Sequence, residues 1–201
     1  IGKYHQLILN KYPVQLGHIL LITNEWKEQN GWLDIKDWEA IKEVNKDTSG
    51  LWFFNSGPLA GASQPHRHIQ LLRRDPSELS CPREKWILGL NNLNYKNEKF
   101  SKNIILKKFS KSLNEENIYE IYKDLSYNLG LGDPRNDKKP KYPYNLIFTD
   151  RWMIIIKRKT DNLFGISINA LGFAGYILVT ENSDIKYLRE LGPEKLLEDF
   201  L

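Results

Sequence analysis

The chain has 201 residues, of which 41% are hydrophobic, enough to bury a core in one or two domains. The 29 Lys and Arg residues exceed the 25 Asp and Glu residues only slightly, giving a formal charge of +4. This mild excess favours anionic ligands without indicating nucleic acid. Because Cys81 is the single cysteine, the sequence excludes an internal disulfide and a zinc site of the CxxC type. It is typical of a reducing, cytoplasmic compartment.

The apolar segments of the sequence are too short for a membrane-spanning protein. The apolar runs at 19–22 and 153–156 are much shorter than the roughly 18 residues that a membrane-spanning helix needs, so we expect no membrane partner. The chain begins Ile1-Gly2-Lys3, without methionine and without a signal-peptide pattern, which indicates a trimmed fragment.

The first part of the chain predicts strands and one helix. Apolar residues predict buried strands at 4–10 and 17–23, joined by a turn at 11–13. Asp34 is expected to cap a helix whose apolar side chains, at Ile35, Trp38, Ile41 and Val44, recur every three residues. A buried strand at 51–54, a Gly/Pro/Ser-rich loop at 55–65 and a strand at 66–72 follow.

The second part adds helices and a hairpin. A helix is predicted through Trp86 and Leu90, followed by a Lys-rich polar connection at 91–111 that includes a strand at 104–109. Asn114 is expected to cap a helix that ends near Gly130, and strands at 144–149 and 152–157 are close enough to form a hairpin. We predict a further strand at 176–180 and helices at 183–191 and 194–201, so the fold class is α+β.

Two of the four histidines lie two positions apart, at His66 and His68. Because side chains alternate along a strand, His66, His68 and Gln70 share one face, while Ile69 and Leu71 enter the core. This pattern fits a catalytic pair, a structural pair or half of a metal site, although no third ligand lies nearby in the sequence. His5 and His18 are expected to have core or surface roles.

The loop before these histidines is suited to holding an anion. Gly57, Gly61, Ala62 and Ser63 are small enough for backbone N–H groups to converge. Asn55, Ser63 and Gln64 add neutral donors. An unprotonated imidazole nitrogen beside a bound phosphate can attack phosphorus and carry the group covalently, and His68 is the best placed to do so.

The segment NSGPLAGASQPHRHIQLL, at 55–72, resembles the histidine-triad (HIT) superfamily. It is most similar to the ATP adenylyltransferase branch, the diadenosine tetraphosphate phosphorylases, which has a His-x-His-x-Gln signature. The resemblance extends to HQLILNKYPVQLGHILLIT, YPYNLIFTDRWMIIIKRK, GISINALGFAGYILV and ELGPEKLLEDF. Galactose-1-phosphate uridylyltransferase is less similar, because its zinc cysteines have no counterpart here.

The resemblance implies a HIT-like antiparallel sheet flanked by helices, with a C-terminal extension that completes the nucleotide site. It implies a catalytic core at 1–80, a helical, Lys-rich insertion at 81–140 and a C-terminal adenylyltransferase region at 141–201. The family has residues before the position of Ile1 that complete the sheet and supply a phosphate-binding lysine. Their absence here leaves the fragment's activity open.

The resemblance also implies site residues. His68 is the nucleophile, supported by His66 and Gln70. The implied phosphate or nucleotide contacts are Asn55, Gly61, Ala62, Ser63, Gln64, Gln70, Asn10, Lys11, Met153 and Lys157. For Lys157 the alternative is the solvated end of a strand, and for Asn10 and Lys11 it is a simple turn.

Gln70 favours group transfer over hydrolysis, because an amide cannot release a proton at neutral pH. We expect His68 to attack the α-phosphorus of diadenosine tetraphosphate and release ATP. Inorganic phosphate then takes the AMP group to give ADP, and the reverse direction makes the dinucleotide. The backbone carbonyl of His66 is expected to set the tautomer of His68. Magnesium is expected to arrive on the substrate, with no zinc and no dedicated metal site.

Other interpretations remain open. The same residues suit a HIT-type dinucleotide hydrolase or a nucleotide-binding module without turnover. Nucleic-acid binding through the lysines at 96–111 is disfavoured, because a solvated connection accounts for them. The sequence leaves open adenosine phosphosulfate as a donor, the oligomeric state and the aromatic residue that contacts the base.

Overall fold

The computed structural model describes residues 1–75, 77–90, 97–110 and 113–201. Within these ranges seven strands form one antiparallel sheet in the order β1-β2-β4-β3-β6-β7-β5. The strands are β1 (His5–Leu9), β2 (His18–Thr23), β3 (Gly50–Asn55), β4 (His68–Arg73), β5 (Ile104–Lys108), β6 (Tyr144–Phe148) and β7 (Trp152–Lys157). The predicted α+β fold with an antiparallel sheet is confirmed, and strands from all three predicted segments pair in it.

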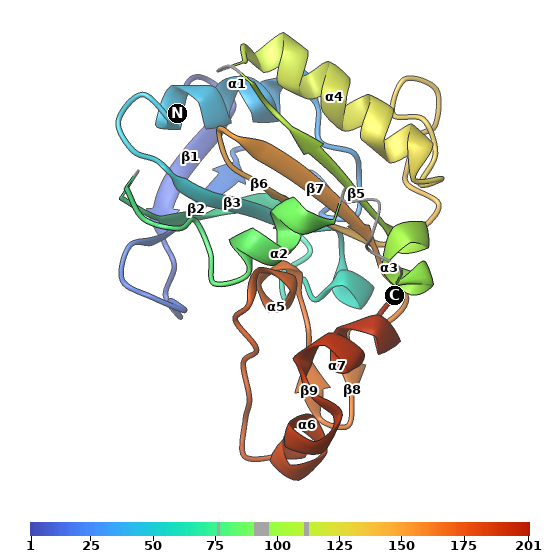
Figure 1. Cartoon of the computed structure of the whole chain (residues 1–201). Coiled ribbons are helices and arrows are strands. Elements are labelled where there is room, and N and C mark those ends of the chain that lie inside the picture. Colours follow the sequence, from blue (N-terminus) through green and yellow to red (C-terminus); the bar gives the residue numbers. More distant parts are fainter. Residues whose placement is uncertain (76, 91–96, 111–112) are drawn as a thin grey trace.

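Helices cover both faces of the sheet (Figure 1). On one face lie α1 (Ile35–Val44) and α4 (Glu115–Asn128). On the other lie α2 (Glu84–Gly89), α3 (Glu98–Asn103), α5 (Ala170–Ala174) and α7 (Pro193–Asp199), while α6 (Ile185–Leu191) lies farther out beside the short strands β8 (Asn162–Leu163) and β9 (Ile166–Ser167). The one-turn helix η1 (Pro58–Ala60) follows β3.

The central strands are apolar on both faces because both faces are covered. In β3, Trp52 and Phe54 pack towards α1 and α4, whereas Leu51 and Phe53 pack towards α2 and α5. Strand β7 alternates in the same way, with Ile154 on the α5 face. Alternate residues of each continuous apolar strand therefore contribute to two hydrophobic cores, one on each side of the sheet.

Local signals place the two long helices. Asp34 forms a capping box with Asp37, since each side chain accepts from the other residue's backbone N–H. Asn114 caps α4 by accepting from the N–H of Asn117 at 2.9 Å. Both caps lie where the sequence predicts them.

Two expectations need correction, and some short elements were not predicted. Strand β1 is mostly exposed, not buried, because it is an edge strand and only His5 turns into the core. Residues 176–180 form no strand and are largely half-buried or exposed. The short helix α3 and the β8–β9 hairpin were not predicted, because both are too short for hydrophobic periodicity to show. Of the Lys-rich connection, Lys96 and Lys111 lie outside the described residues.

No helix in the described parts of the chain combines the length and the apolar character needed to cross a bilayer.

Candidate active site

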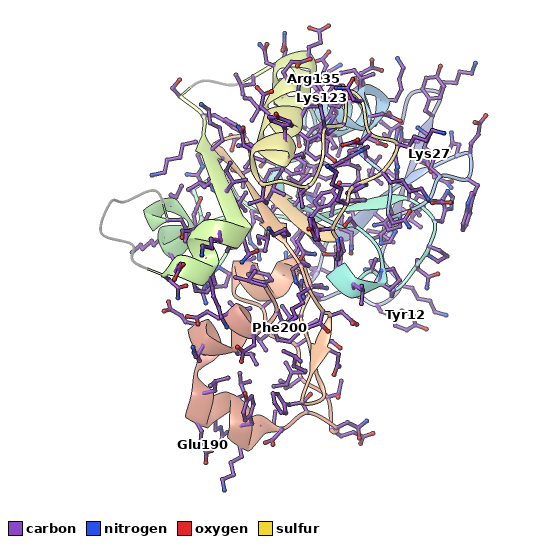
Figure 2. All side chains as sticks on the ribbon, turned by 90° about the vertical axis from the view of Figure 1, so that its right-hand side faces the viewer. Tyr12, Lys27, Lys123, Arg135, Glu190 and Phe200 are labelled. Carbon is purple, nitrogen blue, oxygen red and sulfur yellow. The ribbon has the colours of Figure 1, made fainter. Side chains whose placement is uncertain are left out.

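A cavity of about 560 Å³ opens on the α5 face of the sheet, over β2, β4 and the loop after β3. Its floor comes from alternate residues of two paired strands. In that pairing Leu20 lies opposite Gln70, and Ile22 lies opposite His68. Asn169 and Leu171, at the start of α5, close one side. Figure 2 shows Tyr12, from the loop after β1, beside this part of the sheet.

The ring of His68 is held by the residue two positions earlier, just before the start of β4. Its Nδ1 lies 2.8 Å from the carbonyl oxygen of His66, so Nδ1 carries the proton and donates it. In the neutral ring Nε2 is then the unprotonated nitrogen, and no described residue hydrogen-bonds it. Burial lowers the pKa of His68, and the neighbouring His66 ring adds to this against the opposing effect of the carbonyl. A neutral, oriented imidazole suited to nucleophilic attack results.

Gln29 fixes the backbone of His68 from behind. Its Oε1 accepts from the N–H of His68 at 2.8 Å, and its Nε2 donates to the carbonyl of His68 at 3.1 Å. The same Nε2 donates to the carbonyl of Asn55 at 2.8 Å. Because Gln29 is 2% exposed, no water competes with these bonds. The side chain thus ties β4 to the end of β3.

His18 determines which end of the Gln70 amide faces the cavity. The backbone N–H of Val14 donates to His18 Nδ1 at 3.3 Å, as does the amide of Asn10 at 3.2 Å. Since Nδ1 accepts, Nε2 carries the proton and donates to Gln70 Oε1 at 2.9 Å. The Nε2 amide hydrogens of Gln70 are left to donate into the cavity.

The amide of Asn55 is oriented by the same logic. Its Oδ1 accepts from the backbone N–H of Ala170 at 3.0 Å and from Asn145 Nδ2 at 2.8 Å. Asn145 also donates to the carbonyl of Ala60, in the loop, at 2.8 Å. Asn55 therefore presents its N–H groups to the cavity. Two fixed amides provide donors for phosphoryl oxygens without reorganisation.

A buried arginine holds this network to the C-terminal segment. Arg158 is 2% exposed and donates to Asn145 Oδ1. It also donates to the carbonyls of Ile168, at 2.8 Å, and of Thr160 and Phe200. Figure 2 places Phe200 where the C-terminal helices meet the sheet. The segment after β7 thus supplies both a wall of the site and its support.

The loop itself depends on Gly61. Its φ is +83°, in the left-handed region, and a Cβ there would lie 2.6 Å from Cβ of Asn169. Only glycine therefore lets the loop approach α5 this closely. Gly61, Ser63 and Gln64 line the cavity together with the histidines.

Most of the predicted site residues meet in one place. The structure brings His66, His68, Gln70, Asn55, Gly61, Ser63, Gln64, Asn10 and Lys11 to the cavity. Lys11 is exposed at its mouth, with Nζ 5.3 Å from the centre of the Tyr12 ring. Ala62 lies on the other side of the loop, in a neighbouring cavity.

Met153 and Lys157 are not brought to this cavity. Met153 is completely buried in the core beneath α1 and α4, on the opposite face of the sheet. Strand parity puts Lys157 on that same face, where its Nζ lies 5.3 Å from the centre of the Tyr142 ring. The two residues share a face, as predicted, but it is not the face of the cavity.

The polar residues that orient or support the site, His18, Gln29, Asn145 and Arg158, were not identified from the sequence. A signal existed only for His18, which alternates with Leu20 and Ile22 along β2. That signal becomes informative only once β2 is known to pair with β4. The other three are defined by contacts between distant segments.

The cavity is lined by amides, imidazoles, a lysine and small side chains, together with apolar and aromatic side chains such as Leu20, Phe53 and Tyr12, and without a carboxylate among its described residues. The described residues also include no group of three or more His, Cys, Asp or Glu arranged to hold a metal ion. Cys81 is buried, and burial raises the pKa of its thiol to about 12, which makes it a poor ligand and nucleophile.

Comparison with known proteins gives consistent family matches. Residues 1–87 match the family model of the Ap4A phosphorylase N-terminal domain, and residues 81–200 match that of the ATP adenylyltransferase C-terminal domain. Among curated proteins, the chain is 26% identical over 215 residues to diadenosine 5',5'''-P1,P4-tetraphosphate phosphorylase 2 of Saccharomyces cerevisiae, covering 94% of this chain and 66% of the relative. It is 28% identical to Protein APA1 of the same yeast, covering 92% and 64%. The chain therefore spans about two thirds of these relatives.

The fold has solved counterparts. The crystal structure of the yeast Ap4A phosphorylase Apa2 superposes with a TM-score of 0.71 at 22% identity, covering 98% of this chain and 71% of that one. The structure of Apa2 in complex with Ap4A gives 0.70 at 23% identity, with the same coverage. With fold, sequence and family models in agreement, the chain belongs to the Ap4A phosphorylase and ATP adenylyltransferase family of the HIT superfamily.

Proposed function

We propose that the chain transfers AMP from diadenosine tetraphosphate (Ap4A) to inorganic phosphate through a covalent intermediate on His68. Nε2 of His68 attacks the α-phosphorus and the P–O bond to ATP breaks, with its electron pair leaving on ATP. A phosphate oxygen then attacks the same phosphorus, the P–N bond breaks, and ADP leaves. The reverse sequence makes the dinucleotide from ATP and ADP.

The observation that carries this proposal is the hydrogen bond from His68 Nδ1 to the carbonyl of His66 at 2.8 Å. It leaves a neutral Nε2 available in a cavity that also contains the oriented amides of Gln70 and Asn55. As phosphorus becomes five-coordinate, charge grows on its non-bridging oxygens. Donors already in place stabilise that charge.

The residues around His68 favour phosphate over water as the acceptor. Activating water requires a general base. The residue two positions after His68 is Gln70, whose amide cannot act as one. Phosphate is already a nucleophile and needs no such base. The related yeast proteins are named as phosphorylases, which supports the same choice against the hydrolase.

We further propose that magnesium reaches the site on the polyphosphate. The cavity's oxygen-bearing side chains are amides and the hydroxyls of Ser63 and Tyr12, without a lining carboxylate among the described residues. Mg²⁺ usually binds through one or two carboxylates plus substrate phosphates. The chain's own residues would therefore contact the phosphates, and the ion would neutralise part of their charge.

Intact-mass analysis tests the nucleophile. The chain is mixed with Ap4A without phosphate, beside the His68→Ala variant. We expect an added AMP mass that is absent in the variant and that disappears on adding phosphate, with release of ADP. His5→Ala serves as a histidine control outside the cavity and should retain the adduct.

The outcomes separate the candidate functions. AMP produced without any need for phosphate would indicate the hydrolase. Binding of Ap4A without adduct or turnover would indicate a binding module.

A further inference from the structure

A second cavity, of about 520 Å³, lies across the phosphate loop from the first. Ser63 and Gln64 line both cavities, so the loop is a shared wall. The remaining lining includes Trp26, Asn30, Pro58 and Lys139. No step at His68 uses these residues, although they lie directly beyond the donors that hold the reacting phosphate.

Trp26 is the most conspicuous of them. Its side chain is 64% exposed, although indole is among the most costly groups to leave in water. One face stacks on the ring of His66, with centroids 5.0 Å apart and planes inclined by 26°. The other face of the indole stacks on no ring of the residues that the structure describes, so it is available to a ligand.

His66 makes this platform rigid. Its Nε2 lies 3.0 Å from Thr23 Oγ1 and 3.2 Å from the carbonyl of Glu25, which fixes the ring. Trp26 is thereby held next to the residue whose carbonyl orients His68. A platform fixed in advance binds a flat ligand without the entropy cost of ordering the aromatic side chain.

We infer that Trp26 and the second cavity bind the purine base of the leaving nucleotide, while the first cavity holds the AMP group that is transferred. This inference rests on the proposed function. The leaving group must depart from phosphorus on the side away from Nε2, and the Ser63–Gln64 wall separates the reacting centre from the second cavity. A base stacks on an aromatic face, and the amide of Asn30 matches the donor and acceptor pair on the edge of adenine.

Two ligands that differ only in the second adenosine test the inference. Ap4A carries it, whereas adenosine 5'-tetraphosphate has the same transferable AMP and the same four phosphates but ends without a nucleoside. Equilibrium binding of both is measured by calorimetry on the His68→Ala chain, in which no transfer can occur, with and without Trp26→Ala. We expect Trp26→Ala to weaken Ap4A binding by about tenfold and to leave adenosine tetraphosphate binding within about twofold.

Controls distinguish stacking from a structural effect. Trp26→Phe should recover most of the Ap4A affinity, and Tyr127→Ala, at another aromatic side chain that is 62% exposed, should change neither ligand. Equal weakening of both ligands would mean that Trp26 acts only through His66, and no weakening would mean that the base lies elsewhere. Either result overturns the inference.

The experiments distinguish failure of the proposed AMP transfer from failure of the proposed base subsite. If wild-type chain forms no AMP adduct but Trp26→Ala still weakens only Ap4A, the subsite stands and the transfer does not. If neither ligand binds the His68→Ala chain, the inference is overturned together with the assignment of the cavity.

Discussion

His18 and Gln70, which are 52 positions apart, meet through a hydrogen bond of 2.9 Å between His18 Nε2 and Gln70 Oε1. Because the backbone N–H of Val14 donates to Nδ1 of His18, the proton of the neutral ring is on Nε2. A residue without apparent chemistry in the sequence therefore determines that Gln70 turns its amide N–H groups towards the cavity.

This relationship predicts non-additive kinetics. Gln70→Ala should lower the rate of adduct formation by about 10² to 10³ through loss of a donor. His18→Phe, which keeps a ring against Phe53, should lower it by about tenfold, since the amide is free to turn over. In the double variant, His18→Phe should add almost nothing. Single-turnover rates measure this, and fully additive effects would mean that His18 acts independently of Gln70.

The histidines predict where the acid limit of the reaction lies. Burial is the largest cause that lowers the pKa of both His68 and His18 below the ordinary 6.5. The neutral, reactive form of His68 therefore persists below pH 6.5. Adduct formation measured without phosphate should stay flat down to pH 6.5 and fall only below it. A midpoint above 6.5 would contradict the assigned state of His68.

The same shifts predict how stability depends on pH. The unfolded chain takes up these protons near pH 6.5, whereas the folded chain does so only at lower pH. The stabilisation is therefore complete above about 6.5 and is lost as the pH falls towards the folded-state values. Urea unfolding of the His68→Asn variant should show a weaker dependence in this window than the wild type.

Gln29 should matter for stability and for the position of His68. Gln29→Met leaves the N–H and carbonyl of His68 and the carbonyl of Asn55 without their partner in a buried place. We expect a loss of about 3 kcal/mol in the free energy of unfolding, measured with urea. Gln15→Met is the matched control, because that amide makes one exposed bond to the carbonyl of Arg73. A loss below about 0.5 kcal/mol for both variants would contradict the role assigned to Gln29.

Arg158 should not be replaceable by lysine. A guanidinium donates in fixed directions to Asn145 and to three backbone carbonyls, whereas an ammonium cannot reach all of them. Arg158→Lys should therefore cost about 2–4 kcal/mol of unfolding free energy. Arg135→Lys, in an exposed cluster with Glu120 and Asp124, should cost less than about 1 kcal/mol. Equal losses of unfolding free energy in the two variants would mean that the buried site does not require a guanidinium.

Features that depend only on residues close together in the chain could be predicted from the sequence alone. Alternation along one strand put His66, His68 and Gln70 on the cavity side and Ile69 in the core. The carbonyl that holds His68 lies two positions earlier in the chain, so a short segment fixes the tautomer by itself. The caps at Asp34 and Asn114 were recognised for the same reason.

Features that depend on strand order were decided only by the tertiary structure. Hydrophobicity made β1 and β2 look alike, but β1 lies at the edge of the sheet, so most of its side chains are exposed. Parity placed Met153 and Lys157 on one face without showing that the cavity is on the other. Arg158 contacts Asn145 across 13 positions, and Asn145 contacts Ala60 and Asn55 across 85 and 90 positions. Side-chain direction is a local property of the backbone, whereas the partner that a polar group meets depends on how the whole sheet is assembled.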